Sequence, residues 1–435
     1  MVDRLYDNNQ KDQENRRMFG PKILENIDDH SETAAGFWMD TLCVPVKNDE
    51  LRNQAIKQMR TIYQKAHRVL VLDSWVQELD CKANIVEKAS RLYLCNWQHR
   101  LWTLQEGVLA RNLHFQFKDG RQTIEQLHKD NERYQQTSPG FYSSIVGFTL
   151  NFVPTFGFTL EYIPGTEDQR DPGMAGLFPL MLNGVMSRTT TRESDETICF
   201  ATLLDFPSNA FDKLQAAKGE KRMEVFLHTI GSFGQAIIFN DLPRLTTPEF
   251  RWAPSSWLGQ ARSIVRDDLD YNDDTMVLDG GGLAVEFPAI KLGSMGSHLG
   301  KTITVISRKK HSLGCRIELK TYEELPHWRA DSTYAAILNT EIGKHQKSCE
   351  AVIGVLNPKN LESESARLWD TGILEHVARA TVECVDENTL MKANDKCGTH
   401  LHMQKKMSSE GYNELCTEGC PVVGDWLETD EWLIL

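Results

Sequence analysis

The stretch HRLWTLQEGVLARNLHF, from His99 to Phe115, decides how the N-terminal part of this chain folds. Its apolar residues recur at intervals of three and four, as in an amphipathic helix, and a short apolar run typical of a strand follows them. The helical positions are Leu101, Trp102, Gln105, Val108 and Leu109, and the strand is predicted over Leu113 to Phe117. Glu106 lies within the predicted helix.

Two upstream segments predict further strands. Phe37 to Met39 form an apolar run that ends on Asp40, which predicts a short buried strand with an acid at its carboxyl end. Val69 to Leu72 form an uninterrupted apolar run before Asp73 and Ser74, which predicts a strand covered on both faces.

Helices are predicted between these strands. Apolar residues at threes and fours predict an amphipathic helix over 49 to 66 with Asp49 as its N-cap, and a second helix is predicted over 84 to 94. The order strand, helix, strand, helix, strand predicts an α/β fold with a parallel sheet. Ligands bind at the carboxyl ends of such strands, where this reading places Asp40, Cys43, Asp73 and Ser74.

The chain is too long for one ordinary domain, and its pattern changes twice. Residues 1 to 120 are predicted as the α/β module, and residues 121 to 250 as a mostly helical region with helices over 173 to 186 and 210 to 232. Residues 251 to 435 are predicted to be β-rich, with strand-like runs such as TITVIS and CEAVIGVL.

Composition excludes some functions. A formal net charge of −13 argues against nucleic-acid binding, which requires a basic surface. The polar N-terminus lacks the apolar core of a secretory signal, and ten scattered cysteines fit reduced thiols in a cytoplasmic protein. Residues 141 to 160 contain no charge, but Asn151, Pro154 and two glycines favour a buried hairpin or irregular core segment over a membrane span.

Three segments together resemble the fungal heterokaryon incompatibility (HET) domain. They are WMDTLCVP from Trp38 to Pro45, a helix with Met59, Ile62, Tyr63 and Ala66, and RLWTLQE from Arg100 to Glu106. The run SRTTTRESDETICFATLL at 187 to 204 is similar to a stretch that often follows that domain, and RWAPSSWLG at 251 to 259 resembles a tract further along. The block like Y-x-A-L-S-Y-x-W-G that usually opens the family has no match before Phe37, so an N-terminally shortened domain is expected, and Pro45 departs from the family's loop.

The resemblance implies a distant relation to TIR domains and their flavodoxin-like parallel sheet. On that reading Glu106 falls on the catalytic glutamate of TIR domains that cleave NAD to nicotinamide and ADP-ribose. NAD would then be a substrate, with no cofactor expected. The implied biology is fungal non-self recognition and regulated cell death, a form of innate immunity.

The alternative is a non-enzymatic signalling or scaffold module that acts by assembly. Its expected partners are a second copy, other HET or TIR-like domains, or NLR-type signalling proteins, and neither nucleic acid nor a membrane is expected.

Each candidate site residue also has a plain structural interpretation. Glu106 is either the catalytic carboxylate or a glutamate on an exposed helix face. The tryptophans either stack on a nicotinamide or adenine ring or belong to the core, and Asp40 either contacts a ribose hydroxyl or caps a turn. Arg100 either binds phosphate or pairs with Asp40 or Glu106. The residues predicted to contact NAD are Trp38, Asp40, Ser74, Arg100 and Trp102.

The cysteines are not predicted to be catalytic. Cys43 has no histidine near it in sequence and is predicted to be a buried structural thiol. A C-terminal cluster has spacing that matches no standard zinc site, so no metal is expected there. Its members are Cys397, His400, His402, Cys416 and Cys420.

Overall fold

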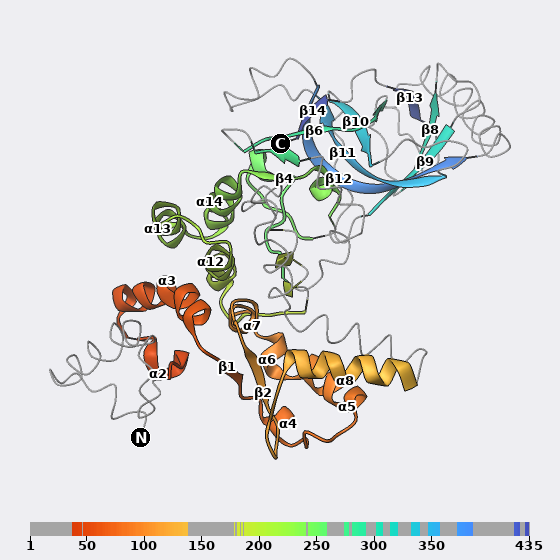
Figure 1. Ribbon diagram of the computed structural model, residues 1–435. Helices are drawn as coiled ribbons and strands as arrows, with labels where there is room; N and C mark the ends of the chain where they lie inside the picture. Colours follow the sequence, from red (N-terminus) through yellow and green to blue (C-terminus); the bar gives the residue numbers. More distant parts are fainter. Residues whose placement is uncertain are drawn as a thin grey trace, which may run out of the picture. The chain divides into compact units, whose positions relative to one another are not determined.

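The computed structural model divides the chain into two compact units, Met1–Gln215 and Ala216–Leu435. The structure describes residues 37–45, 47–137, 178, 181–182, 184–185, 187–240, 242–258, 274–277, 281–292, 302–307, 314–320, 332–339, 347–356, 372–385, 422–426 and 431–434. The chain is of mixed α/β class, with a small mixed sheet and helices in the first unit and a larger curled mixed sheet in the second (Figure 1).

The sheet of the first unit has the strand order β1-β2-β3. β1 (Val69–Val71) runs parallel to β2 (Leu113–Gln116), and β3 (Arg121–Thr123) pairs antiparallel with β2. The parallel pair and its helical crossover confirm the predicted strands at Val69 and Leu113. The third strand makes the sheet mixed rather than wholly parallel.

Helices α2 to α7 lie before β2 in the chain, and α8, α12 and α13 follow β3. Their bounds are α2 (Asp40–Cys43), α3 (Asp49–Lys65), α4 (Ser74–Gln77), α5 (Ile85–Leu94), α6 (Asn96–His99), α7 (Thr103–Val108), α8 (Ile124–Thr137), α12 (Glu193–Leu203) and α13 (Ser208–Ala216). The amphipathic patterns over 49 to 66 and 84 to 94 are therefore confirmed as α3 and α5. The N-cap of α3 is Asn48, whose side chain accepts from the Leu51 amide, and not Asp49 as predicted.

The predicted strand at Phe37 to Met39 is wrong. These residues are not in a strand, Asp40 begins helix α2, and Phe37 is 69% exposed. The Asp40 carboxylate accepts from the Thr41 amide, and the Cys43 amide donates to the Met39 carbonyl, so the chain turns at once into a helical loop. A three-residue apolar run is too short to define a period, so it does not distinguish a strand from the approach to a helix.

Two burial predictions in this unit are also wrong. Leu70 and Leu72 are 45% and 54% exposed, so one face of β1 is open where the sequence predicted cover on both faces. Cys43, predicted to be buried, is exposed because α2 buries none of its residues.

The second unit begins with α14 (Glu220–Ile230), β4 (Ser232–Gly234), the 3-10 helices η2 (Gln235–Phe239) and η3 (Pro248–Phe250), and β5 (Asp274–Met276), which pairs with β4. A nine-stranded sheet follows, in the order β11-β10-β7-β13-β8-β9-β12-β14-β6. The bounds are β6 (Leu283–Glu286), β7 (Ala289–Leu292), β8 (Thr302–Ser307), β9 (Gly314–Leu319), β10 (Thr333–Leu338), β11 (Ser348–Leu356), β12 (Gly372–Val385), β13 (Val422–Trp426) and β14 (Glu431–Ile434).

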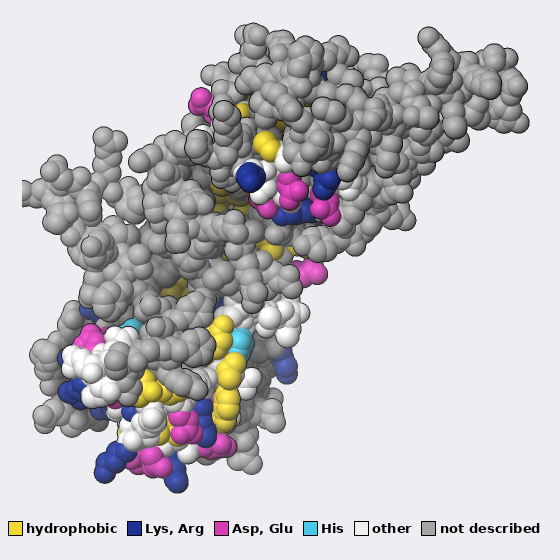
Figure 2. Space-filling view, turned by 90° about the vertical axis from the view of Figure 1, so that its right-hand side faces the viewer, with side chains coloured by type: hydrophobic (Ala, Val, Ile, Leu, Met, Phe, Trp, Pro, Cys, Tyr) yellow, Lys and Arg dark blue, Asp and Glu magenta, His cyan; other side chains and the backbone are white. Residues whose placement is uncertain are grey.

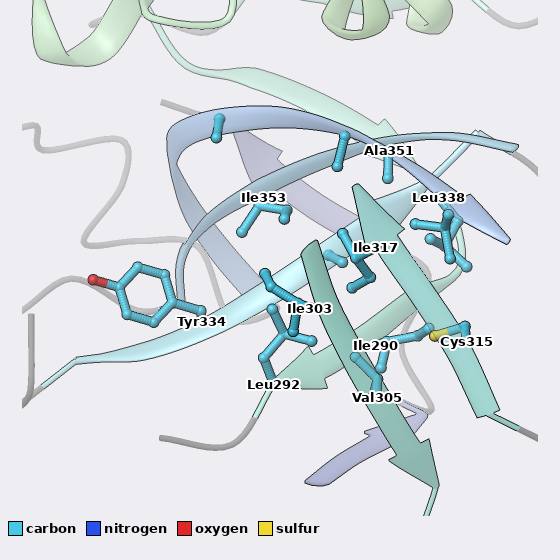
Figure 3. Packing of buried hydrophobic residues seen from close by; sticks show 14 of the residues in the cluster. Ile290, Leu292, Ile303, Val305, Cys315, Ile317, Tyr334, Leu338, Ala351 and Ile353 are labelled. Atoms are coloured by element: carbon cyan, nitrogen blue, oxygen red, sulfur yellow. The ribbon is translucent and has the colours of Figure 1, made fainter. Parts of the chain in front are cut away.

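This sheet curls until β11 also pairs with β12, so that seven strands form a closed ring. Alternating apolar side chains from its strands fill the interior, among them Ile303, Ile317 and Ile353 (Figure 3). The predicted strands TITVIS and CEAVIGVL are confirmed as β8 and β11, and the predicted helical stretch over 210 to 232 as α13 and α14.

Several other predictions fall partly or wholly outside the described residues. They concern the uncharged segment at 141 to 160, most of the helix over 173 to 186, and the C-terminal cysteine and histidine cluster. The described helices include none with the length and apolar character needed to cross a bilayer. On the face shown in Figure 2, basic and acidic side chains of the described residues are interspersed with apolar ones.

His376 on β12 is buried in the second unit, at 7% exposure. Its Nε2 atom has no hydrogen-bond partner within the described part of the chain. Burial lowers the pKa of His376 well below its usual value, and the positive charges of Arg244, Arg379 and Arg251 lower that pKa further. His376 is therefore neutral in the folded chain.

We expect the second unit to lose stability as the pH falls below about 6.5, the pKa of an unperturbed histidine. The unfolded imidazole takes up a proton there while the folded one does not, so acid favours the unfolded state. The free energy of unfolding, measured in urea between pH 7 and pH 5, should fall by up to about 1.4 kcal/mol per pH unit. The His376→Gln variant should lose this component, and equal slopes for both proteins would contradict the assignment.

Candidate functional site

The site is built on two short helices, α6 and α7, and Asp73 anchors the first of them. The buried Asp73 carboxylate accepts from the amides of Trp75 (3.0 Å) and Val76 (3.4 Å) at the start of α4. Its other oxygen accepts from the Trp97 amide of α6 at 3.2 Å. Asp73, which follows β1, therefore caps α4 and positions α6, and both of its carboxylate oxygens accept hydrogen bonds from backbone amides.

Glu106 on α7 is held by two donors from other helices. The indole Nε1 of Trp97 (α6) donates to Glu106 Oε2 at 2.8 Å, and the hydroxyl of Tyr63 (α3) donates to Oε1 at 3.4 Å. The glutamate is partly buried, so it does not lie on an open helix face. The structure thus brings two donors, one of them 43 residues away in sequence, to the Glu106 carboxylate.

Burial is the main cause of an altered pKa at Glu106. It raises the pKa of the carboxyl group, and the negative charge of Asp40 raises that pKa further. The hydrogen bonds from Trp97 and Tyr63 and the positive charge of Arg100 act in the opposite direction, but the pKa remains above its usual value. The pKa of Tyr63 is also raised, first by its own burial and then by the charge of Glu106.

Four of the predicted site residues gather around Tyr63. The Trp38 ring meets the Tyr63 ring edge to face, with centroids 5.3 Å apart, and Glu106 accepts the Tyr63 hydroxyl. Asp40 and Arg100, whose charges both act on Glu106, form an ion pair at 3.9 Å. The Arg100 side chain is 61% exposed and the Asp40 side chain 36%, so water and small molecules can reach this pair.

Two predicted site residues lie elsewhere. The Trp102 indole donates to Asp195 of α12 at 2.7 Å, which ties α7 to that helix. Ser74 is exposed at the first position of α4, directly after the Asp73 cap. Neither is a hydrogen-bond partner of Glu106 among the described residues.

Sequence reasoning missed Trp97 and Tyr63 as partners of Glu106. Tyr63 is predicted only as part of the apolar stripe of α3 and as one of the residues, with Met59, Ile62 and Ala66, through which that helix resembles the family. Trp97 lies in a segment without clear periodicity. The position of Tyr63 in the helix that resembles the family is the only sequence signal that points to either residue as part of the site.

Arg188 supports the site from a distant segment. Its side chain is fully buried and crosses the face of the Trp97 ring at 5.8 Å. Nη1 donates to the Arg100 carbonyl at 2.7 Å and to Thr103 Oγ1 at 2.9 Å, while Nε donates to the Gly184 carbonyl at 2.9 Å. Burial lowers the pKa of Arg188 to about 10, which leaves the group charged at neutral pH.

The backbone beside Arg188 is joined to the same turn. The Leu101 amide donates to the Thr189 carbonyl at 2.9 Å, and the Thr189 amide donates to the His99 carbonyl at 2.8 Å. Cys199 of α12 accepts from Gln105 Nε2 at 3.3 Å. The run at 187 to 204 is therefore packed into the first unit, against the helices that carry Glu106.

This arrangement can bind and stabilise positive charge. A carboxylate with a raised pKa lies beside aromatic rings and an accessible ion pair, which suits a cationic ring or a developing carbocation. Within the described residues, no group of three or more His, Cys, Asp or Glu side chains is arranged to hold a metal ion.

Residues 22–83 match the family model described as Heterokaryon incompatibility protein (HET). The match includes the WMDTLCVP segment, α3, β1 and α4, and it ends before the RLWTLQE block that carries Glu106. Comparisons with curated proteins and with solved structures found no match.

Proposed function

We propose that this chain, which carries a heterokaryon incompatibility (HET) domain at residues 22–83, cleaves NAD to nicotinamide and ADP-ribose as part of fungal non-self recognition. A HET domain implies a role in fungal heterokaryon incompatibility. The parallel pair β1 and β2 with its helical crossover supports a TIR-like module. The observation that carries the enzymatic proposal is the Glu106 carboxylate, partly buried and held by Trp97 and Tyr63.

The chemistry requires one well-placed carboxylate. As the bond between ribose C1′ and the nicotinamide nitrogen breaks, its electron pair leaves with the nicotinamide, and positive charge develops on the ribose. Glu106 stabilises this oxocarbenium-like state. Water then adds at C1′ and loses a proton, which gives ADP-ribose.

The neighbouring side chains suit the rest of the substrate. Trp38 offers an aromatic face to the nicotinamide or adenine ring. The Arg100 guanidinium is exposed enough to contact a phosphate, and Asp40 can accept a ribose hydroxyl when their ion pair opens.

Glu106→Gln tests this proposal directly. The amide keeps the shape of the side chain but removes its charge, so we expect nicotinamide release from NAD to fall by about 100-fold or more. The full chain is incubated with NAD and the released nicotinamide is quantified by chromatography. Glu132→Gln, an exposed change on α8, is the matched control and should keep full activity.

The pH profile gives a second readout of the same site. The reaction needs the ionised carboxylate, and burial raises the pKa of Glu106, so activity should decline with acid at a higher pH than for an ordinary glutamate. Equal release by wild type and Glu106→Gln, or release by neither, would contradict the enzymatic proposal.

The alternative function, assembly without catalysis, is favoured by a different observation. Among the described strands β1 lies at one edge of its sheet, and the apolar side chains of Leu70 in it and of Leu72 and Trp75 directly after it are exposed, as is Leu94 at the end of α5. Such a surface favours association with a second copy or with another HET, TIR-like or NLR-type protein. Light scattering on wild type, on Glu106→Gln and on Leu72→Lys separates the two functions: loss of association in Leu72→Lys alone, with no nicotinamide release by wild type, would favour assembly.

A further inference from the structure

Three cysteines lie on adjacent strands of the second unit. Cys315 is on β9, Cys384 on β12 and Cys349 on β11, and β12 pairs with both of the other strands. Cys315 (labelled in Figure 3) and Cys349 are buried in the core of the curled sheet, at 5% and 8% exposure. Cys384 packs against that core and is only partly buried. One thiol is therefore more accessible than its two neighbours.

The register places Cys384 directly opposite Cys315 on antiparallel strands. The Cys384 amide donates to the Lys347 carbonyl at 2.7 Å, on the β11 side, so the polar backbone groups of Cys384 point away from β9. Cys315 and Cys384 thus form a non-hydrogen-bonded pair, in which Cα atoms lie about 4.5 Å apart and the side chains share one face. Disulfides span Cα separations of roughly 4.4 to 6.8 Å, so this pair can be bridged without moving the strands.

Cys349 lies in a different relation to Cys384. It is opposite Val382, two residues away along β12, and so is a diagonal neighbour. Diagonal neighbours on antiparallel strands are about 7 to 8 Å apart, which is beyond the usual span of a disulfide. The structure therefore selects Cys315 over Cys349 as the partner of Cys384.

We propose that Cys315 and Cys384 are a site of reversible thiol oxidation, at which a small-molecule disulfide such as oxidised glutathione converts the two thiols into a cross-strand disulfide. Cys384 attacks one sulfur of the glutathione disulfide, which releases one glutathione and leaves a mixed disulfide. Cys315 then attacks the Cys384 sulfur and releases the second glutathione. The two cysteines lose two electrons and two protons, and two molecules of reduced glutathione carry them.

Burial affects the rate of this reaction. It raises the pKa of Cys315 to about 12 and also raises the pKa of Cys384, so both groups are thiols at neutral pH. Because the thiolate is the attacking form, the exchange should be faster at pH 8.5 than at pH 7. The disulfide would join β9 to β12 near the end of their pairing and close a long loop between residues 315 and 384.

The test uses the full, reduced chain with excess oxidised glutathione at pH 7 and at pH 8.5. Remaining thiols are blocked with N-ethylmaleimide, and disulfide-linked peptides are identified by mass spectrometry. We expect a peptide pair that joins Cys315 to Cys384, and a rise in the midpoint of thermal unfolding of about 5 to 10 °C that reduction reverses.

Two serine variants sharpen the result. Cys349→Ser removes the diagonal thiol and should leave the yield of the Cys315–Cys384 peptide unchanged. Cys315→Ser should stop the reaction at a lasting glutathione adduct on Cys384. A link from Cys384 to any other cysteine, an adduct on Cys384 that persists in wild type, or no reaction at either pH would each overturn the proposal.

Discussion

Arg188→Met should lower the free energy of unfolding of the first unit by about 3 to 5 kcal/mol. The methionine fills much of the same volume but donates no hydrogen bond, so the acceptors at Gly184, Arg100 and Thr103 lose the Arg188 donor together, and the Arg100 carbonyl keeps only the bond from Thr103 Oγ1. The cation that covers the Trp97 ring is lost as well. Each buried acceptor left without a donor costs about 1 to 3 kcal/mol, which makes this one of the most damaging single changes in the unit.

Urea unfolding of the full chain, followed by tryptophan fluorescence, measures this loss. Arg192→Met is the matched control, because Arg192 lies four residues away and is exposed. The control should change the free energy of unfolding by no more than about 0.5 kcal/mol. Similar stability for the Arg188 and Arg192 variants would show that the buried guanidinium is not needed to hold α6 and α7.

Gly354→Ala should destabilise the second unit by about 3 kcal/mol. A Cβ atom at this position would lie 2.3 Å from the Glu375 carbonyl oxygen and 2.5 Å from Leu374 Cγ. The register of β11 against β12 shifts between Ile353 and Gly354, so the added methyl group would meet the backbone of β12 at the pairing that closes the ring of strands. The strands must separate to admit it.

The same urea experiment, with Thr333→Ala as control, tests this expectation. Thr333 is an exposed residue at the start of β10, where the loss of its side chain should cost less than about 1 kcal/mol. A Gly354→Ala protein as stable as the Thr333→Ala protein would contradict the close approach of β11 and β12.

The spacing of apolar residues predicts much of the secondary structure of the first unit, because each of these helices and strands shows its period within a few consecutive residues. The stripe of α3 and the apolar runs at Val69 and Leu113 show their period within a few residues, and these elements are confirmed. The apolar run at Phe37 is too short to show a period, and in the structure it precedes helix α2 and forms no strand. The exposed face of β1 could not be foreseen, because burial depends on which elements cover a strand.

In the candidate site, too, some features could be predicted from the sequence and others could not. Glu106 could be singled out from its motif, but its hydrogen bonds come from Tyr63 and Trp97, which reach it through the packing of three helices. Arg188 contributes from a segment far along the chain, and no spacing rule connects it to α6. The pairing of Cys315 with Cys384 depends on strand register, which the sequence does not specify without knowledge of the sheet order.

The curled sheet of the second unit also has a consequence for how the chain acquires its structure. β6 pairs with β14, so residues near 283 meet residues near 434, and β13 inserts between β7 and β8 although it follows them by more than a hundred residues. During synthesis the early strands leave the ribosome long before the strands that pair with them. Their unpaired edges and apolar side chains stay exposed until those partners are made. Such non-local pairing favours slow folding, and the ring of strands can be completed only after the last of them has left the ribosome.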